Sequence, residues 1–180
     1  VCGYNLEIGI TATLDASVSE PGQTVINAKY FSDIIRKLPD EKVFFTVGDN
    51  NDAAIMSGMS QFNLVAMPAI EFPELPKTES DKKLSLESGV LKSLINGTAF
   101  ATAISETKPL LAGVLFDVGD NVLKVAATDN ARLAVRIEQL SLSDDHIPFK
   151  FIVPGITLRE IERIIRDDDT DVTLFLSRKH

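Results

Sequence analysis

An acidic and a basic residue stand close together in the segment AATDNARLAV at 126–135, where Asp129 and Arg132 interrupt an apolar run. A carboxylate held beside an arginine could act as a general base next to an anion clamp, as in a small hydrolase or lyase. No histidine, serine nucleophile or second carboxylate stands beside this pair in the sequence. We therefore interpret the segment first as a turn between two strands, in which Asp129 caps its own backbone. The hydrolase or lyase is kept as an alternative.

Few other residues are suited to catalysis or to metal binding. The acidic segment RDDDTD at 166–171 lacks the glycine and the closing glutamate of a calcium loop, which favours a solvated turn. One cysteine, Cys2, and two histidines are too few for a typical zinc site. No glycine-rich phosphate loop occurs in the sequence. The sequence thus predicts no catalytic set, no metal site and no cofactor.

Composition and charge restrict the class of protein. Apolar residues make up 44% of the 180 residues, which is enough for a packed core. No apolar run approaches the ~18 residues of a membrane span, and the lone cysteine and lack of a signal peptide favour a cytoplasmic protein. The net charge of −8 argues against nucleic-acid binding only if the charges are evenly mixed. Because the chain begins at Val1 rather than at a methionine, we expect a fragment of a longer protein.

A structural unit recurs along the chain. Residues 24–47 and 151–176, with a weaker copy at 83–104, each contain a short apolar strand followed by an amphipathic helix. The strands expected after the first helix cover about 42–47, 53–57 and 60–66. The sequence therefore predicts an α+β architecture in which antiparallel sheets pack against helices.

Alignment of the copies fixes equivalent positions. Phe31, Leu91 and Leu158 fall at the same place in the three helices. The opening segment GYNLEIGITATL reads as the end of an earlier copy, so that Tyr4-Asn5 stands where Thr128-Asp129 stands later. The proline-rich stretch at 67–83 reads as a domain boundary.

Positive charge is concentrated on one side of the predicted helices. In the helix at 156–166 the inward side is Leu158, Ile161, Ile164 and Ile165, and the outward side is Arg159, Arg163 and Arg166. In the helix at 28–38 the inward side is Phe31, Ile34, Ile35 and Leu38, and the outward side is Lys29, Arg36 and Lys37. The middle helix offers only Lys92 and Asn96. A charged face can be merely solvated, but its repetition on equivalent helices favours a common binding surface.

Several motifs, in this order, resemble the bacterial DNA polymerase sliding clamp, the β processivity subunit. They are LEIGITATL, AMPAIEFPELP, AFATAISETKPLLAGVLFDV, AATDNARLAVRIEQL and FIVPGITLREIERII. The resemblance implies the DNA-clamp fold, in which repeated β-α-β-β-β units place antiparallel sheets outside and helices along the DNA side. It also implies that residues 1–75 are the C-terminal part of clamp domain 1, that residues 76–180 are most of domain 2, and that the third domain is absent.

The resemblance assigns two groups of site residues. Those expected to face DNA are Lys29, Arg36, Lys37, Lys92, Asn96, Ser105, Lys108, Arg159, Arg163 and Arg166. Those expected to line a hydrophobic cleft for short peptide motifs are Leu111, Thr128, Asn130, Ala131, Arg132 and Leu133. The family often has Gly-His where this chain has Asn130-Ala131. Asparagine tolerates the left-handed conformation of a glycine, so the turn can form, whereas an imidazole is lost at Ala131.

The leading hypothesis is therefore a non-catalytic processivity factor for DNA replication. By resemblance it binds duplex DNA without sequence preference, and it binds the replicative polymerase and clamp-loader subunits through peptide motifs. The full-length protein is expected to form a homodimeric ring, with the strand at about 60–66 as the pairing edge. A generic β-rich interaction scaffold remains an alternative beside the hydrolase or lyase.

Overall fold

The chain divides into two units, Val1–Lys77 and Thr78–His180. The computed structural model describes residues 1–39, 42–75, 82–104, 109–141, 148–166, 168 and 170–177. Within these ranges, no helix is both long and apolar enough to cross a membrane.

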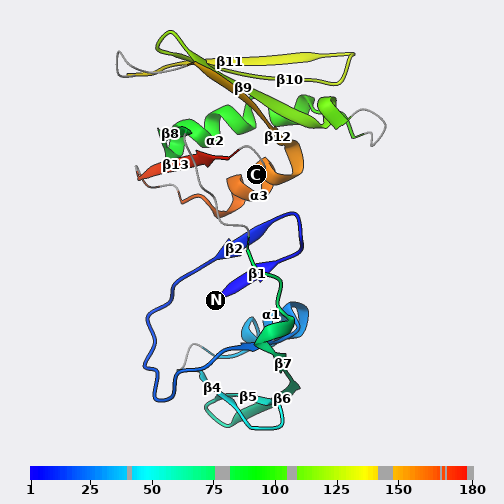
Figure 1. Ribbon diagram of the computed structural model, residues 1–180, viewed down its shortest axis with the longest axis vertical. Coiled ribbons are helices and arrows are strands. Elements are labelled where there is room, and N and C mark those ends of the chain that lie inside the picture. The colour runs from blue at the N-terminus through cyan, green and yellow to red at the C-terminus, as the bar shows by residue number, and fades with distance from the viewer. Residues whose placement is uncertain are drawn as a thin grey trace. The chain divides into compact units, whose positions relative to one another are not determined.

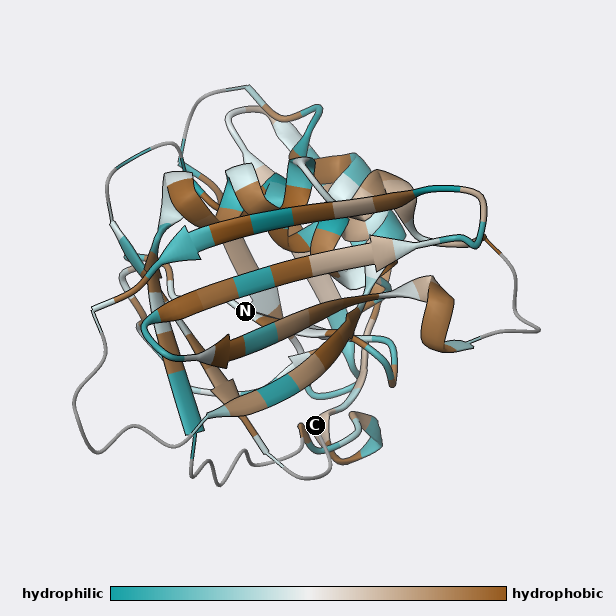
Figure 2. Ribbon diagram, turned by 90° about the horizontal axis from the view of Figure 1, so that it is seen from above, coloured by the Kyte–Doolittle hydropathy of each residue, from teal (hydrophilic) through white to brown (hydrophobic). Residues whose placement is uncertain are grey.

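A four-stranded antiparallel sheet in the order β11-β10-β9-β12 is the largest element of the second unit (Figures 1 and 2). Its strands are β9 (Gly113–Gly119), β10 (Val122–Thr128), β11 (Leu133–Gln139) and β12 (Phe149–Pro154). A separate antiparallel pair consists of β8 (Lys82–Glu87) and β13 (Asp171–Leu176). The helices are α2 (Ser88–Asn96), α3 (Gly155–Ile164) and the short 3-10 turns η2 (Ala99–Ala101) and η3 (Pro109–Ala112). α2 and α3 contact each other and the strands that precede them.

Alternation of side chains along the strands builds the core of this unit. In β9, Val114, Phe116 and Val118 are fully buried, because every second side chain of a strand points to the same face. α2 contributes Leu91 and Leu94 to the same cluster, and Figure 1 shows this helix lying along the sheet. One helix face and one sheet face thus bury each other.

The first unit combines small antiparallel groups of strands with the helix α1 (Ala28–Ile35). The strands are the hairpin β1 (Cys2–Tyr4) and β2 (Gly9–Thr11), the pair β3 (Thr24–Val25) and β7 (Met67–Pro68), and the sheet β4 (Phe44–Val47), β5 (Asp52–Ser57) and β6 (Ser60–Val65). A short 3-10 turn, η1 (Ala69–Glu71), follows β7. Asn27 caps α1, because its Oδ1 accepts from the N–H groups of Lys29 and Tyr30 at 3.1 and 3.3 Å.

The predicted alignment of the three helices is confirmed. The helices begin at Ala28, Ser88 and Gly155. The aligned residues Phe31, Leu91 and Leu158 are therefore each the fourth residue of their helix. The first of them is half-buried and the other two are fully buried. The same local pattern thus produces the same element three times.

Two apolar residues that were predicted to face inward are exposed instead. Ile164 is 58% exposed and Ile35 is 38% exposed. α3 ends at Ile164 rather than at residue 166, because Ile165 adopts extended backbone and packs against the core in its place. α1 ends at Ile35 rather than at residue 38, since the next bonds, Lys37 N–H to Ile34 and onward, follow the tighter 3-10 spacing.

Candidate functional site

Hydrogen bonds fix the turn between β10 and β11. Asp129 Oδ1 accepts from the backbone N–H groups of Ala131 and Arg132, both at 3.0 Å. Thr128 Oγ1 donates to the carbonyl oxygen of Arg132 at 2.7 Å. Asn130 has a φ of 74°, which confirms the left-handed conformation predicted at this position. The turn is therefore held in one geometry by its own side chains.

The charged pair in this turn supports its geometry. Arg132 Nε donates to Asp129 Oδ2 at 2.9 Å. The backbone N–H groups of Ala131 and Arg132, and then the Arg132 side chain, hold the pKa of Asp129 below its usual value. Both carboxylate oxygens already accept hydrogen bonds and the group stays ionised. Asp129 is therefore poorly suited to be the general base that the hydrolase or lyase alternative requires.

Apolar side chains stand beside the turn. Leu133, the first residue of β11, is 69% exposed. Phe100 in η2 is 58% exposed, and the guanidinium carbon of Arg132 lies 5.7 Å from the centre of its ring. Leu111 in η3 is half-buried. A rigid turn flanked by exposed apolar side chains is a surface on which a partner can dock.

The predicted basic face of α3 is exposed but partly neutralised. Arg159 and Arg163 on the helix and Arg166 just after it are all exposed. Arg163 Nη1 lies 2.7 Å from Glu160 Oε1, whereas Arg159 Nη1 donates to a backbone carbonyl oxygen, that of Ala99, at 3.5 Å. The ion pair lowers the local positive charge at Arg163, and Arg159 keeps its full charge.

The other predicted DNA-facing residues differ in their surroundings. Exposed on α1 and the turn after it are Lys29, Arg36 and Lys37. On α2, Lys92 is half-buried, and Asn96 Nδ2 donates to Glu162 Oε1 of α3 at 3.4 Å. Outside the described residues lie Ser105 and Lys108. Exposed cations thus occur on helices of both units.

Comparison with known proteins identifies the family. A family model described as the DNA polymerase III beta subunit, central domain, matches residues 85–180, and the model for the N-terminal domain of the same subunit matches residues 1–76. The chain belongs to the DNA polymerase III beta subunit family. It is 37% identical over 177 residues to the beta sliding clamp of Staphylococcus epidermidis, an alignment that covers 96% of this chain and 46% of that protein. The chain thus spans about half the length of the beta-subunit relatives it matches.

Solved structures of beta subunits have the same fold. A protein assigned as a DNA polymerase III beta subunit of Eubacterium rectale gives a TM-score of 0.93 at 29% identity, over 99% of this chain and 49% of that chain. The DNA polymerase sliding clamp of Bacillus subtilis gives a TM-score of 0.84 at 34% identity, over 90% of this chain and 42% of that chain. The fold of this chain is therefore the clamp fold, as its motifs predicted.

Phe100 was not among the residues predicted for the cleft of this beta-subunit chain. Its segment, AFATAI, contributes to the family resemblance, but no local pattern places it beside Arg132. The contact joins the residues after α2 to the turn before β11, and only the fold brings these together. An aromatic residue shortly after the end of α2, at a position that Gly97, Thr98 and Ala99 separate from the helix, is a sequence signal that could have suggested it.

The acidic segment after α3 shows a structural role at the residue that can be described. The carbonyl oxygen of Asp168 accepts a hydrogen bond from Ser88 Oγ, and its carboxylate accepts one from Thr170 Oγ1 at 2.5 Å. Asp167 and Asp169 lie outside the described residues. In the part of the chain that can be described, no group of three or more His, Cys, Asp or Glu side chains could hold a metal ion.

Proposed function

We propose that this chain is part of a sliding clamp that encircles duplex DNA in the cytoplasm and tethers the replicative polymerase for processive synthesis. Family membership and the matched relatives, which are named beta sliding clamps, support the proposal. Residues 1–75 would form the C-terminal part of clamp domain 1 and residues 76–180 most of domain 2. The division of the chain into units at Lys77 and Thr78 supports this assignment.

The exposed apolar surface at the β10–β11 turn is the observation that carries the proposal. Leu133 follows Arg132 in the chain, Phe100 lies against the guanidinium group of Arg132, and both apolar side chains are exposed. The alkyl stem of Arg132 can cover apolar surface while its charged head stays hydrated. A partner peptide that inserts a leucine or phenylalanine gains roughly 1.5–3 kcal/mol for each fully buried side chain. Peptide motifs of polymerase and clamp-loader subunits are the proposed ligands, and the role of the turn is binding rather than catalysis.

The proposed hold on DNA is topological and only weakly electrostatic. A closed ring needs no contact with any base, so its helices need only attract the phosphates without fixing them. Exposed cations such as Arg159 on α3 and Lys29 on α1 can supply this attraction. A net charge of −8 is compatible with such a role, since the attraction of DNA depends on the charge of the face that meets it rather than on the charge of the whole chain.

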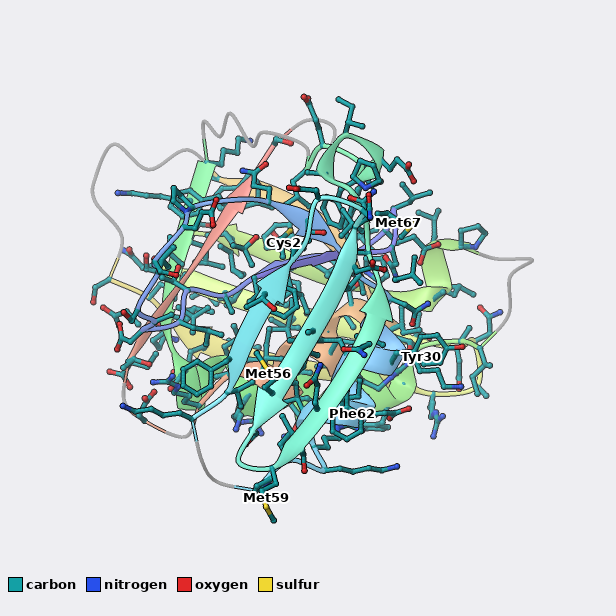
Figure 3. The ribbon with its side chains drawn as sticks, turned by 90° about the horizontal axis from the view of Figure 1, so that it is seen from below. Cys2, Tyr30, Met56, Met59, Phe62 and Met67 are labelled. Atoms are coloured by element: carbon teal, nitrogen blue, oxygen red, sulfur yellow. The ribbon has the colours of Figure 1, made fainter. Side chains whose placement is uncertain are left out.

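The proposed ring is a homodimer at full length, and β6 is its proposed pairing edge. β6 is the last strand of its sheet, and Phe62 on it is partly exposed. Tyr30 on α1 is also exposed, and Figure 3 shows both residues on the β6 side of this sheet. An edge strand with apolar neighbours can extend its sheet into a second subunit.

Retention on circular DNA tests this function in the protein at the full length of its relatives. After a clamp loader has acted, we expect the protein to stay on a nicked circular duplex through a high-salt wash. It should leave when the circle is cut once, because a linear duplex has ends over which a ring can slide. The same circle without loader is the control. Equal retention on cut and uncut DNA would contradict the proposal.

A further inference from the structure

The hairpin of the first unit contains a second copy of the β10–β11 turn. Asn5 Oδ1 accepts from the backbone N–H groups of Glu7 and Ile8 at 3.0 and 2.7 Å. The N–H of Asn5 donates to the carbonyl oxygen of Ile8 at 3.2 Å, and Leu6 has a φ of 75°. The matching distances at Asp129 are 3.0, 3.0 and 3.3 Å, with a φ of 74° at the next residue. The predicted equivalence of the two turns is thus confirmed in their backbone geometry.

The two turns differ in the residue that follows them. In the second unit this residue is Leu133, whose side chain is exposed, and in the first unit it is Gly9. A Cβ atom added at Gly9 would lie 2.5 Å from Cδ2 of Leu75 and 3.3 Å from a ring carbon of Tyr4. Leu75 is half-buried and belongs to the segment after η1, which runs past the β1–β2 hairpin in Figure 1. The absence of a side chain at Gly9 therefore makes room for Leu75.

We propose that Leu75 is an internal ligand of the first turn. Its side chain lies, within the same chain, in the space that the side chain of Leu133 takes at the second turn, and it covers the surface on which the leucine of a partner peptide would dock. The second half of this statement rests on the proposed function, and the first half rests on the contact at Gly9 alone. The first turn is consequently closed to peptides, and of the two described turns the second is the one open to docking.

The attachment of Leu75 to the same chain favours this occupancy. A tethered group acts at an effective concentration in the millimolar range or above, which a free peptide has to exceed. Pro73, two residues earlier, fixes its own φ near −65° and so reduces the entropy lost when the segment is ordered. A leucine-bearing peptide is therefore the chemistry that would fit the turn once Leu75 is removed.

Leu75→Ala in this 180-residue chain tests the occupancy, with N-acetyl-leucyl-prolinamide as the probe. Amide NMR signals of Leu6 and Gly9 are expected to shift saturably in the variant. In the parent the apparent affinity for the probe should be weaker than in the variant by a factor of about ten or more, because Leu75 leaves the site free for only a small fraction of the time. Leu14→Ala, at an exposed leucine of the same unit, is the matched control and should behave as the parent. Equal shifts in parent and variant, or no shift in Leu75→Ala, would overturn the proposal.

A double-mutant cycle guards against a variant that merely loosens the first unit. Gly9→Ala should speed amide hydrogen exchange in the β1–β2 hairpin when Leu75 is present, since the new Cβ meets its side chain. The same substitution should have little effect in the Leu75→Ala background. An equal effect in both backgrounds would show that Leu75 does not occupy this position. Hydrogen exchange in the β1–β2 hairpin involves no partner peptide. A negative result there would contradict the placement of Leu75 but not the proposed docking at Leu133. A failure of peptide docking at Leu133 would likewise not contradict the placement of Leu75.

Discussion

The guanidinium group of Arg132 lies over the ring of Phe100, with 5.7 Å between the guanidinium carbon and the ring centre. This contact ties the β10–β11 turn to the segment that follows α2. Arg132 also donates to Asp129, so its side chain is held by the carboxylate of Asp129 and by the ring of Phe100. Phe100 therefore both exposes apolar area and positions Arg132.

Replacing Phe100 by alanine should weaken peptide docking without unfolding the second unit. A cation–π contact at an exposed site contributes about 0.5–1 kcal/mol, and lost contact of the ring with the peptide adds to this. We expect a weakening of roughly five- to tenfold in the full-length protein, by titration of a labelled polymerase-tail peptide. Phe175→Ala, at an exposed phenylalanine of β13, is the control. Unchanged affinity in Phe100→Ala would show that the peptide binds away from this ring.

Leu133→Asp should abolish peptide docking and leave assembly intact. The change places a charge where an apolar side chain is to be buried, so the loss exceeds the roughly 1.5–3 kcal/mol of one buried leucine. Peptide titration and light scattering on the full-length protein would measure the two properties. Ile137→Asp, further along β11, should bind peptide normally. Docking that survives Leu133→Asp would place the cleft elsewhere.

Asp129 should make the second unit sensitive to acid. Its pKa is lowered in the folded state, so its stabilising effect is complete above the ordinary aspartate pKa. That effect is lost as the pH falls through the folded-state pKa. Asp129→Asn should therefore show a smaller drop in thermal midpoint between neutral pH and pH of about 3 than the parent does. Asparagine can still form the turn, as Asn5 does in the first unit.

Asp129→Ala is the companion variant for this experiment. It removes the acceptor for two backbone N–H groups and should lower the thermal midpoint at neutral pH as well. Identical acid sensitivity in the parent and in Asp129→Asn would assign the pH dependence to other groups.

Reversing charge on α3 should weaken retention on DNA in a salt-dependent manner. Arg159→Glu with Arg163→Glu removes two cations, and each cation that neutralises a phosphate contributes about 0.9 to the logarithmic salt slope. The full-length variant should therefore differ from the parent most at low salt, where charges are least screened. Glu160→Gln releases Arg163 from its ion pair and should strengthen retention slightly. A variant that matches the parent at low salt would exclude this face from the DNA side.

Local patterns predicted the elements well and the contacts between elements poorly. The helix positions marked by Phe31, Leu91 and Leu158 followed from apolar periodicity, and the left-handed Asn130 followed from turn chemistry. Both are decided by a few adjacent residues. The predicted end of the helix α3 and the predicted inward position of Ile164 were wrong. The backbone becomes extended after Ile164, so Ile165 packs against the core instead.

The contacts of Phe100 and Leu75 lay outside what the sequence could predict. Each joins segments that are distant in the chain, Phe100 to Arg132 and Leu75 to Gly9. A resemblance to a family locates the turn but does not reveal which side chain of this chain lies against it. The repeat supplied the useful clue, since it marked two turns that could be compared directly.

The filled space beside Gly9 sets the valency of the proposed assembly. If both turns were open, one chain could hold two partners at once, and the local supply of each partner would matter little. With one of the two described turns closed, every protein that uses the other turn competes with the rest by mass action. Partners then replace one another in sequence according to their affinity and concentration, and a hand-over from one to the next requires no change in the shape of the clamp.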